Sequence, residues 1–414
     1  CHREVTMKRL SRCVLLCAVA IAGCSATLPA SRQSSTRAHA AATHAVASLQ
    51  NGSFDEASRQ AGAVLGTDPD NPQARLVRAV VVYRATMHQL SLDVRTVLIG
   101  GLEGGHLNHR YIRSTLEQAE QELANVDADL AVAASDPAVS IELCPACWEI
   151  DWNGNGRVDR RDRLLLQIEQ DADGRSIPEE DPRRKPTYRF DAGDVMWSRA
   201  FVTFQRAAID LLLAWNWTGV DPLLRRGRKP DRIVVRLAHR DRFDRGRELL
   251  LKGLEYTDAC RRSYLAETDD VREWVPNPRQ KDHPMPLPVD AALYETWEGV
   301  VRDLGALVRG DEGLHLGELA ALDDDHHLGR VPTGYLDVGS MLSRPKDIVI
   351  DLDTLERAER ADDVDALLGS VFGSYYVRRM TRSPLPARLA RMKGEVDRQQ
   401  ESMERKLRYL IWLN

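Results

Sequence analysis

The 414-residue sequence contains no internal apolar run of the roughly 18 residues that a membrane-spanning helix needs. It also lacks the short motifs of several enzyme classes, with no P-loop, no G-x-S-x-G elbow, no H-E-x-x-H zinc motif and no Rossmann glycine fingerprint. A basic excess is missing as well, since the formal net charge is −5. These absences argue against an integral membrane protein, against those enzyme classes and against nucleic acid as a partner.

Length and composition leave several architectures open. A chain of 414 residues can form two or three domains or one extended helical array. Its 43% hydrophobic and 29% charged residues are ordinary for a soluble globular protein.

The N-terminal residues have the composition of a secretory signal. The basic residues Lys8, Arg9 and Arg12 precede an apolar run over 13–22, which is too short to cross a membrane as a mature helix. A segment of this kind directs export and is then removed. Export places the remaining cysteines in a compartment where disulfides form.

The end of that run, "IAGC" at 21–24, resembles the lipobox of bacterial lipoproteins. The resemblance implies a signal peptide at 1–23, of which 1–6 are an upstream extension, and a lipid on Cys24. Ser25 follows the cysteine, and in that family a residue other than Asp there implies the outer membrane. We therefore expect a lipid anchor in the bacterial outer membrane, on its periplasmic side or at the cell surface. The alternative is a plain signal peptide with an incidental cysteine.

Composition divides the mature chain into four parts. A small, polar tether at 24–40 has nothing to bury. It is followed by an N-terminal helical region at 41–143, a segment at 144–190 with a cysteine pair and a polar loop, and a C-terminal helical region at 191–414.

Two helical patterns flank "NGSF" at 51–54, and a third begins after "DPDNP" at 68–72. This stretch resembles one degenerate tetratricopeptide repeat whose first helix lacks the large aromatic residue of that family. The residues that match its turn, its small packing position and its closing proline are Gly52, Phe54, Ala57 and Pro69. A plain helical hairpin is the alternative, and either interpretation predicts packed antiparallel helices.

Apolar periodicity predicts that most of the remaining chain is helical. The helical patterns extend over 107–134, 192–217, 243–265, 290–309 and 361–379, with a last one from about 389. The 192–217 pattern is apolar on most faces, which predicts a central, buried helix. Clusters of β-branched residues at 232–237 and 347–352 predict one or two short strands. The expected fold class is therefore mainly α, built from packed helical hairpins.

Residues 151–162, "DWNGNGRVDRRD", place oxygen-bearing side chains at alternate positions around a glycine. The spacing matches the twelve-residue EF-hand loop and resembles the bacterial dockerin-type variant. Calcium takes about six to eight oxygen ligands, so alternate side chains wrap around the ion and Gly156 permits the sharp turn. The expected calcium ligands are the side chains of Asp151, Asn153, Asn155, Asp159 and Asp162 and the backbone carbonyl of Arg157.

Two features of this loop differ from sensor EF-hands. The twelfth position is Asp162 rather than Glu, and only three carboxylates contribute, so we expect a dissociation constant on the order of 10⁻⁴ to 10⁻³ M. Val158 should point inward, and the exit helix should continue through 159–170. A polar turn before a helix cap is the alternative. A second partial motif at 171–174, "DADG", favours a turn because its glycine comes too early.

The pair Cys144 and Cys147, in "CPAC", has the spacing of thiol-oxidoreductases. It lies four residues before the calcium loop and lacks a βαβ context, so we favour a structural disulfide that fixes the start of the loop. Thiol–disulfide exchange, free thiols, or a zinc half-site completed by Cys260 and a histidine are the alternatives.

Other clusters of polar or aromatic residues are less specific. "DDDHH" at 323–327 is interpreted as a solvated loop, and His106 and His109 as the start of a helix. Trp215 and Trp217 are expected to pack in the core.

Taken together, the sequence predicts a calcium-binding, lipid-anchored envelope protein that acts as a scaffold or protein-binding module, with a mainly structural calcium ion. Its expected partners are the membrane, through the lipid, and another envelope protein. An envelope hydrolase is the main alternative, with a site formed by histidines and by acids such as Asp191 and Asp194 or 323–325.

Overall fold

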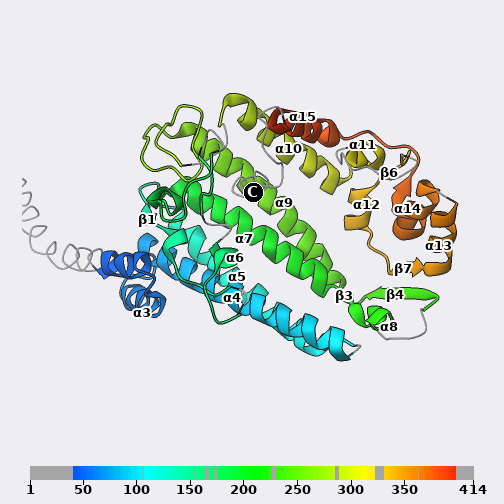
Figure 1. Ribbon diagram of the computed structural model, residues 1–414, viewed down its shortest axis with the longest axis horizontal. Helices are drawn as coiled ribbons and strands as arrows, with labels where there is room; N and C mark the ends of the chain where they lie inside the picture. The colour runs from blue at the N-terminus through cyan, green and yellow to red at the C-terminus, as the bar shows by residue number, and fades with distance from the viewer. Residues whose placement is uncertain are drawn as a thin grey trace, which may run out of the picture.

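The computed structural model describes residues 41–104, 106–152, 154–163, 167–171, 175–224, 230–284, 289–321, 331–361 and 363–397. Several predictions lie outside these residues: the lipidated Cys24 with its tether, the loop ligand Asn153, the 323–327 cluster and the end of the last helix. The described chain is mainly helical with short strands, which confirms the expected fold class (Figure 1). Among the described residues no helix is long and apolar enough to cross a membrane.

Helical hairpins form the N-terminal part, as predicted. A helix over 41–50 is followed by α3 (Phe54–Leu65), α4 (Pro72–Gly104) and α5 (His109–Ala133). Asn71 caps α4 by accepting a hydrogen bond from Ala74 N (3.0 Å), which explains why the helix begins at the proline. Gly52 has φ +71°, a left-handed conformation that suits glycine at the turn before α3.

The two longest helices of the second half are α7 (Ala192–Leu213) and α9 (Arg240–Ala266), and they lie in the middle of the molecule. Helices α4, α5, α7, α9 and α10 (Ala291–Arg309) pack in that order as successive layers (Figure 1). Apolar residues of α7 join those of the N-terminal helices in one hydrophobic core, so the core continues across residue 191. The predicted central position of α7 is explained by its contacts with helices on two sides.

Shorter helices complete the C-terminal part, along α10 and around the N-terminal end of α9 (Figure 1). They are α8 (Asp221–Leu224), α11 (Leu316–Ala320), α12 (Val338–Ser343), α13 (Leu352–Arg360), α14 (Val364–Phe372) and α15 (Leu385–Asp397). The pattern at 361–379 predicted a longer helix than α14. The helix ends because Gly373 turns the chain with φ +55°, after which the backbone enters a strand.

The described residues form three small antiparallel sheets, more than the one or two strands expected. β1 (Ile141–Leu143) pairs with β2 (Tyr188–Phe190), and β5 (Leu314–His315), β6 (Tyr335–Leu336) and β8 (Tyr376–Val377) form a second sheet. The third contains the two predicted strands, since β4 (Arg232–Leu237) pairs with β7 (Ile348–Asp351) on one side and with β3 (Trp215–Asn216) on the other. The 192–217 pattern therefore ends as a helix at Leu213, because Trp215 is opposite Leu237 in this sheet.

Candidate functional site

The loop that begins at Asp151 folds around the carboxylate of that residue. The two carboxylate oxygens accept hydrogen bonds from the backbone N–H groups of Asn155 (3.1 Å) and Gly156 (2.7 Å). Asn155 Oδ1 in turn accepts a bond from Arg157 N (2.8 Å). Gly156 has φ +83°, so the residue expected at the sharp turn adopts a conformation that favours glycine. These contacts curl the chain over the first half of the candidate loop.

The second half of the loop leads into α6 (Arg160–Arg163). Asp162 is buried and accepts a hydrogen bond from Asp159 N (2.9 Å). In a capping box, the acid at the third helical position accepts the backbone N–H of the N-cap residue in this way. Val158 is half-buried. The exit helix was predicted to continue through residue 170. This prediction is wrong for residues 167–170, because Ile168 is buried and donates its N–H to the Arg184 carbonyl instead of continuing a helix.

Three side chains of α4 form hydrogen bonds with backbone carbonyls of the loop. His88 Nε2 lies 2.8 Å from the Asp151 carbonyl oxygen, Ser91 Oγ donates to the Trp152 carbonyl (2.6 Å), and Arg95 Nη1 donates to the Gly154 carbonyl (2.7 Å). Since three consecutive turns of one helix contact three backbone carbonyls, the loop is fixed to α4 over its first residues.

The donor set of the loop suits calcium, because it consists only of carboxylate, amide and backbone oxygens. The residues that the structure describes contain no group of three His, Cys, Asp or Glu side chains placed to hold a metal ion. The carboxylates of Asp151 and Asp162 accept hydrogen bonds from loop N–H groups. These two acids occupy the first and last positions of the calcium-loop motif.

Cys144 and Cys147 form a disulfide with a Cα–Cα separation of 5.3 Å. Cys144 directly follows β1 and precedes the short 3-10 helix η1 (Pro145–Cys147). The first cysteine is buried and β1 belongs to a two-stranded antiparallel sheet, whereas thiol-oxidoreductases expose that thiol at the start of a helix in a βαβ unit. The arrangement is that of a crosslink at the start of the loop segment.

Two acids of the alternative hydrolase site, Asp191 and Asp194, make hydrogen bonds at the start of α7, whereas 323–325 lie outside the described residues. Asp191 and Asp194 form a capping box at the N-terminus of α7, and Asp194 also accepts a hydrogen bond from the Tyr264 hydroxyl (2.7 Å). Burial, and then the neighbouring Asp191, raises the pKa of Asp194 well above its usual range. Glu267, at the C-terminus of α9, lies close by, and burial raises its pKa to about 9. Burial likewise raises the pKa of Glu273 to about 7.

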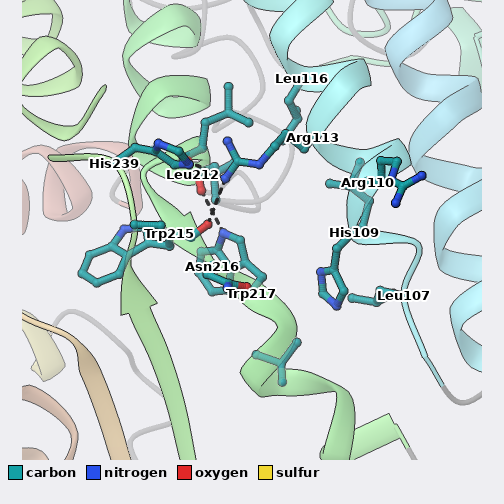
Figure 2. Close-up of a pocket in the computed structure, with 14 residues that line it drawn as sticks. Leu107, His109, Arg110, Arg113, Leu116, Leu212, Trp215, Asn216, Trp217 and His239 are labelled. Atoms are coloured by element: carbon teal, nitrogen blue, oxygen red, sulfur yellow. Dashed lines mark hydrogen bonds between the residues drawn. The ribbon is translucent and has the colours of Figure 1, made fainter. Parts of the chain in front are cut away.

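A pocket of about 590 Å³ opens at the other end of α7, between α5, the β3 strand and the start of α9 (Figure 2). Its walls combine apolar and basic side chains, without a carboxylate: Leu107, His109, Arg110, Ile112, Arg113, Leu116, Leu212, Leu213, Trp215, Asn216, Trp217, Val220, Ala238 and His239. Sequence reasoning missed this pocket. The closely spaced Trp215 and Trp217 were a signal. Both are half-buried and pack, as expected, against the core cluster of Ile233, Val235 and Leu352, but they also line the pocket.

The two histidines interpreted as the start of a helix lie at, and just before, the N-terminus of α5. His109 is the first residue of α5 and lies 2.7 Å from the Asp221 carboxylate, whereas His106 precedes the helix and is exposed.

Comparison of the chain with known protein families, curated proteins and solved structures gives no match.

Proposed function

We propose that this chain is a lipid-anchored protein of the bacterial envelope that binds one structural calcium ion in the 151–162 loop and acts as a scaffold or protein-binding module. The observation that carries the calcium part is the fold of the loop. Asp151 accepts hydrogen bonds from two N–H groups of its own loop, Gly156 makes the left-handed turn, and α4 holds the loop in place. An EF-hand-type loop needs a glycine for the sharp turn at its sixth position, which Gly156 occupies.

When bound, calcium supplies a positive charge that offsets repulsion among the loop carboxylates. The side chains of Asp151, Asn153, Asn155, Asp159 and Asp162 and the carbonyl of Arg157 would hold it. The chain's own part is to present these oxygens. The disulfide fixes the segment before the loop, and α4 fixes its first residues. The ion would thereby brace the 144–190 segment against the N-terminal helices.

The surface offered to a protein partner lies on α4 beside the loop. Val94 and Ile99 are large apolar residues that are exposed on this helix, next to the loop contacts Ser91 and Arg95. Contiguous patches of exposed apolar side chains mark protein interaction sites, and Val94 and Ile99 would belong to such a patch. We propose that an envelope protein binds there, and that calcium steadies this surface.

Calcium titration tests the metal part of this proposal. A Cys24→Ala variant, which takes no lipid, would be titrated with calcium by calorimetry and thermal melting, with magnesium in parallel. We expect one calcium-specific site and a raised melting temperature, both lost in an Asp151→Ala/Asp162→Ala variant. Asp171→Asn is the matched control, because Asp171 lies outside the 151–162 loop, accepts a hydrogen bond from Arg175 N and should leave binding unchanged when substituted. Absence of calcium-dependent heat at millimolar concentrations would reduce the loop to a polar turn.

Labelled fatty-acid incorporation tests the anchor. In a bacterial host the wild-type chain should take up the label and fractionate with the outer membrane, and Cys24→Ala should do neither. Uptake of label by Cys24→Ala would contradict the assignment of the lipid to this cysteine.

A further inference from the structure

The pocket at the C-terminal end of α7 has the size and walls of a small-molecule site. Its volume of about 590 Å³ lies within the roughly 300–1,000 Å³ that ligand pockets occupy. The apolar part of its lining comes from three separate elements, α5, α7 and the strand-to-turn segment after α7. Figure 2 shows Leu212, Trp215 and Trp217 on one side and Leu107 and His109 on the other. These walls favour a ligand with an apolar body.

The formally charged side chains that line the pocket are all positive. They are Arg110 and Arg113, which lie beside the imidazoles of His109 and His239, and no acid is among the lining residues. His109 is paired with Asp221 at 2.7 Å, which lies outside the lining. Arg110 is exposed and has no ion-pair partner among the described residues, so its charge is not compensated locally. The pocket therefore favours an anion over a cation.

Arg113 is held rigidly beside this apolar space. Its Nη2 atom donates to the carbonyl oxygens of Leu213 (2.9 Å) and Trp215 (3.4 Å), as the dashed lines in Figure 2 show, and its Nη1 atom lies 3.5 Å from Glu117. Arg113 thus fixes the wall and contributes a partly compensated charge. The N-terminal end of α9 is also at the pocket, where the side chain of His239 makes no capping hydrogen bond. The positive end of that helix adds to the potential of the arginines.

Apolar side chains remain exposed around this pocket. Leu212, which lines it, is 45% exposed. Leu223, on α8 just after Val220 and Asp221, is 50% exposed. A ligand with a long apolar body could cover these side chains as well as the pocket walls.

We propose that this pocket binds a single-chain amphipathic anion, with an alkyl body against Leu212 and Trp217 and an anionic head near Arg110. Carboxylate and phosphate monoester heads share the chemistry that the arginine recognises. The assignment goes beyond the calcium-braced scaffold and does not depend on it, because none of the pocket residues belongs to the 151–162 loop.

The test is calorimetric titration of the Cys24→Ala chain in calcium-free buffer, below micelle-forming concentrations. The probes are dodecanoate, dodecyl phosphate and the cation dodecyltrimethylammonium. We expect one site for each anion and at least about tenfold weaker binding of the cation. Comparison of the two anions shows which head is preferred. Equal binding of anions and cation, or no binding of either anion, would overturn the proposal.

Variants locate the site. Arg110→Glu and Trp217→Ala should each weaken dodecanoate binding by about tenfold or more. Arg379→Glu is the matched control, since Arg379 is also exposed but lies after β8, outside the pocket lining, and should leave binding unchanged. Because Arg110 is exposed, its substitution leaves the core intact, which far-ultraviolet circular dichroism checks. Unchanged affinity in both pocket variants would show that the anion binds elsewhere. Dodecanoate binding that persists in Asp151→Ala/Asp162→Ala separates this proposal from the calcium site.

Discussion

His88 Nε2 lies 2.8 Å from the carbonyl oxygen of Asp151, across 63 residues of sequence. A carbonyl oxygen only accepts hydrogen bonds, so this histidine nitrogen is the donor. The His88 ring also contacts the Trp152 ring edge to face, with centroids 6.1 Å apart. The first residue of the candidate calcium loop is therefore positioned by a helix that the loop motif itself does not include.

Loss of the His88 contact should weaken calcium binding without abolishing it. His88→Ala removes one hydrogen bond that fixes the loop and leaves every expected ligand in place, so we expect the dissociation constant for calcium to rise about fivefold. Calorimetry of the Cys24→Ala chain measures it. Thr96→Ala is the control, because Thr96 is bonded only within α4, to the Leu92 carbonyl. An equal effect of both substitutions, or none from His88→Ala, would contradict the role given to this contact.

Local patterns in the sequence were sufficient to predict most long elements. The β4 strand occupies the predicted 232–237, and α5 begins and ends within two residues of the predicted 107–134. These elements were predictable because apolar periodicity and β-branched clusters report local burial. The turn around Asp151 could also be predicted from the sequence, because its hydrogen bonds join residues within five positions of each other.

The remaining features depend on contacts between distant segments. The predicted helix over 192–217 stops at Leu213 because Trp215 pairs with a strand that begins 17 residues later. The anionic-ligand pocket joins α5 to the segment after α7, and the attachment of the loop joins α4 to residue 151. No local pattern encodes such pairings, so they appear only when the chain is folded.

Asp210 should contribute strongly to the stability of the central helices. Its side chain is fully buried on α7 and accepts hydrogen bonds from Arg242 (3.0 Å) and Arg245 (2.6 Å) of α9. Asp210→Ala removes the acceptor that the two guanidinium groups share, although Arg242 keeps its bond to Glu117 (3.2 Å), so we expect the free energy of unfolding to fall by about 3 kcal/mol. Asp244→Ala, which breaks a half-exposed pair with Arg240, should cost less than about 1 kcal/mol. Urea denaturation compares them, and similar losses would contradict this ranking.

Two glycine substitutions should have opposite effects on stability. A Cβ atom at Gly219 would lie 1.8 Å from the Val234 backbone oxygen, so Gly219→Ala forces the turn after α7 away from β4. We expect a loss of about 2 kcal/mol in the free energy of unfolding. Gly62 lies within α3 with open space around it, so Gly62→Ala should stabilise by about 0.5 kcal/mol. Thermal denaturation distinguishes them, and a neutral Gly219→Ala would show that the turn is not closely packed.

Glu267 should make the protein less stable as the pH rises. Burial, together with the nearby Asp191 and Asp194, raises its pKa to about 9, and its buried Oε1 atom has no hydrogen-bond partner among the described residues. In the unfolded chain the pKa of a glutamate is about 4.3, so between these values the folded state holds one more proton and stability falls with rising pH. Glu267→Gln, which stays neutral, should flatten the fall in melting temperature between pH 5 and 9, relative to the exposed control Glu255→Gln. Parallel pH profiles for the wild type and Glu267→Gln would show that this carboxyl group is already ionised in the folded protein.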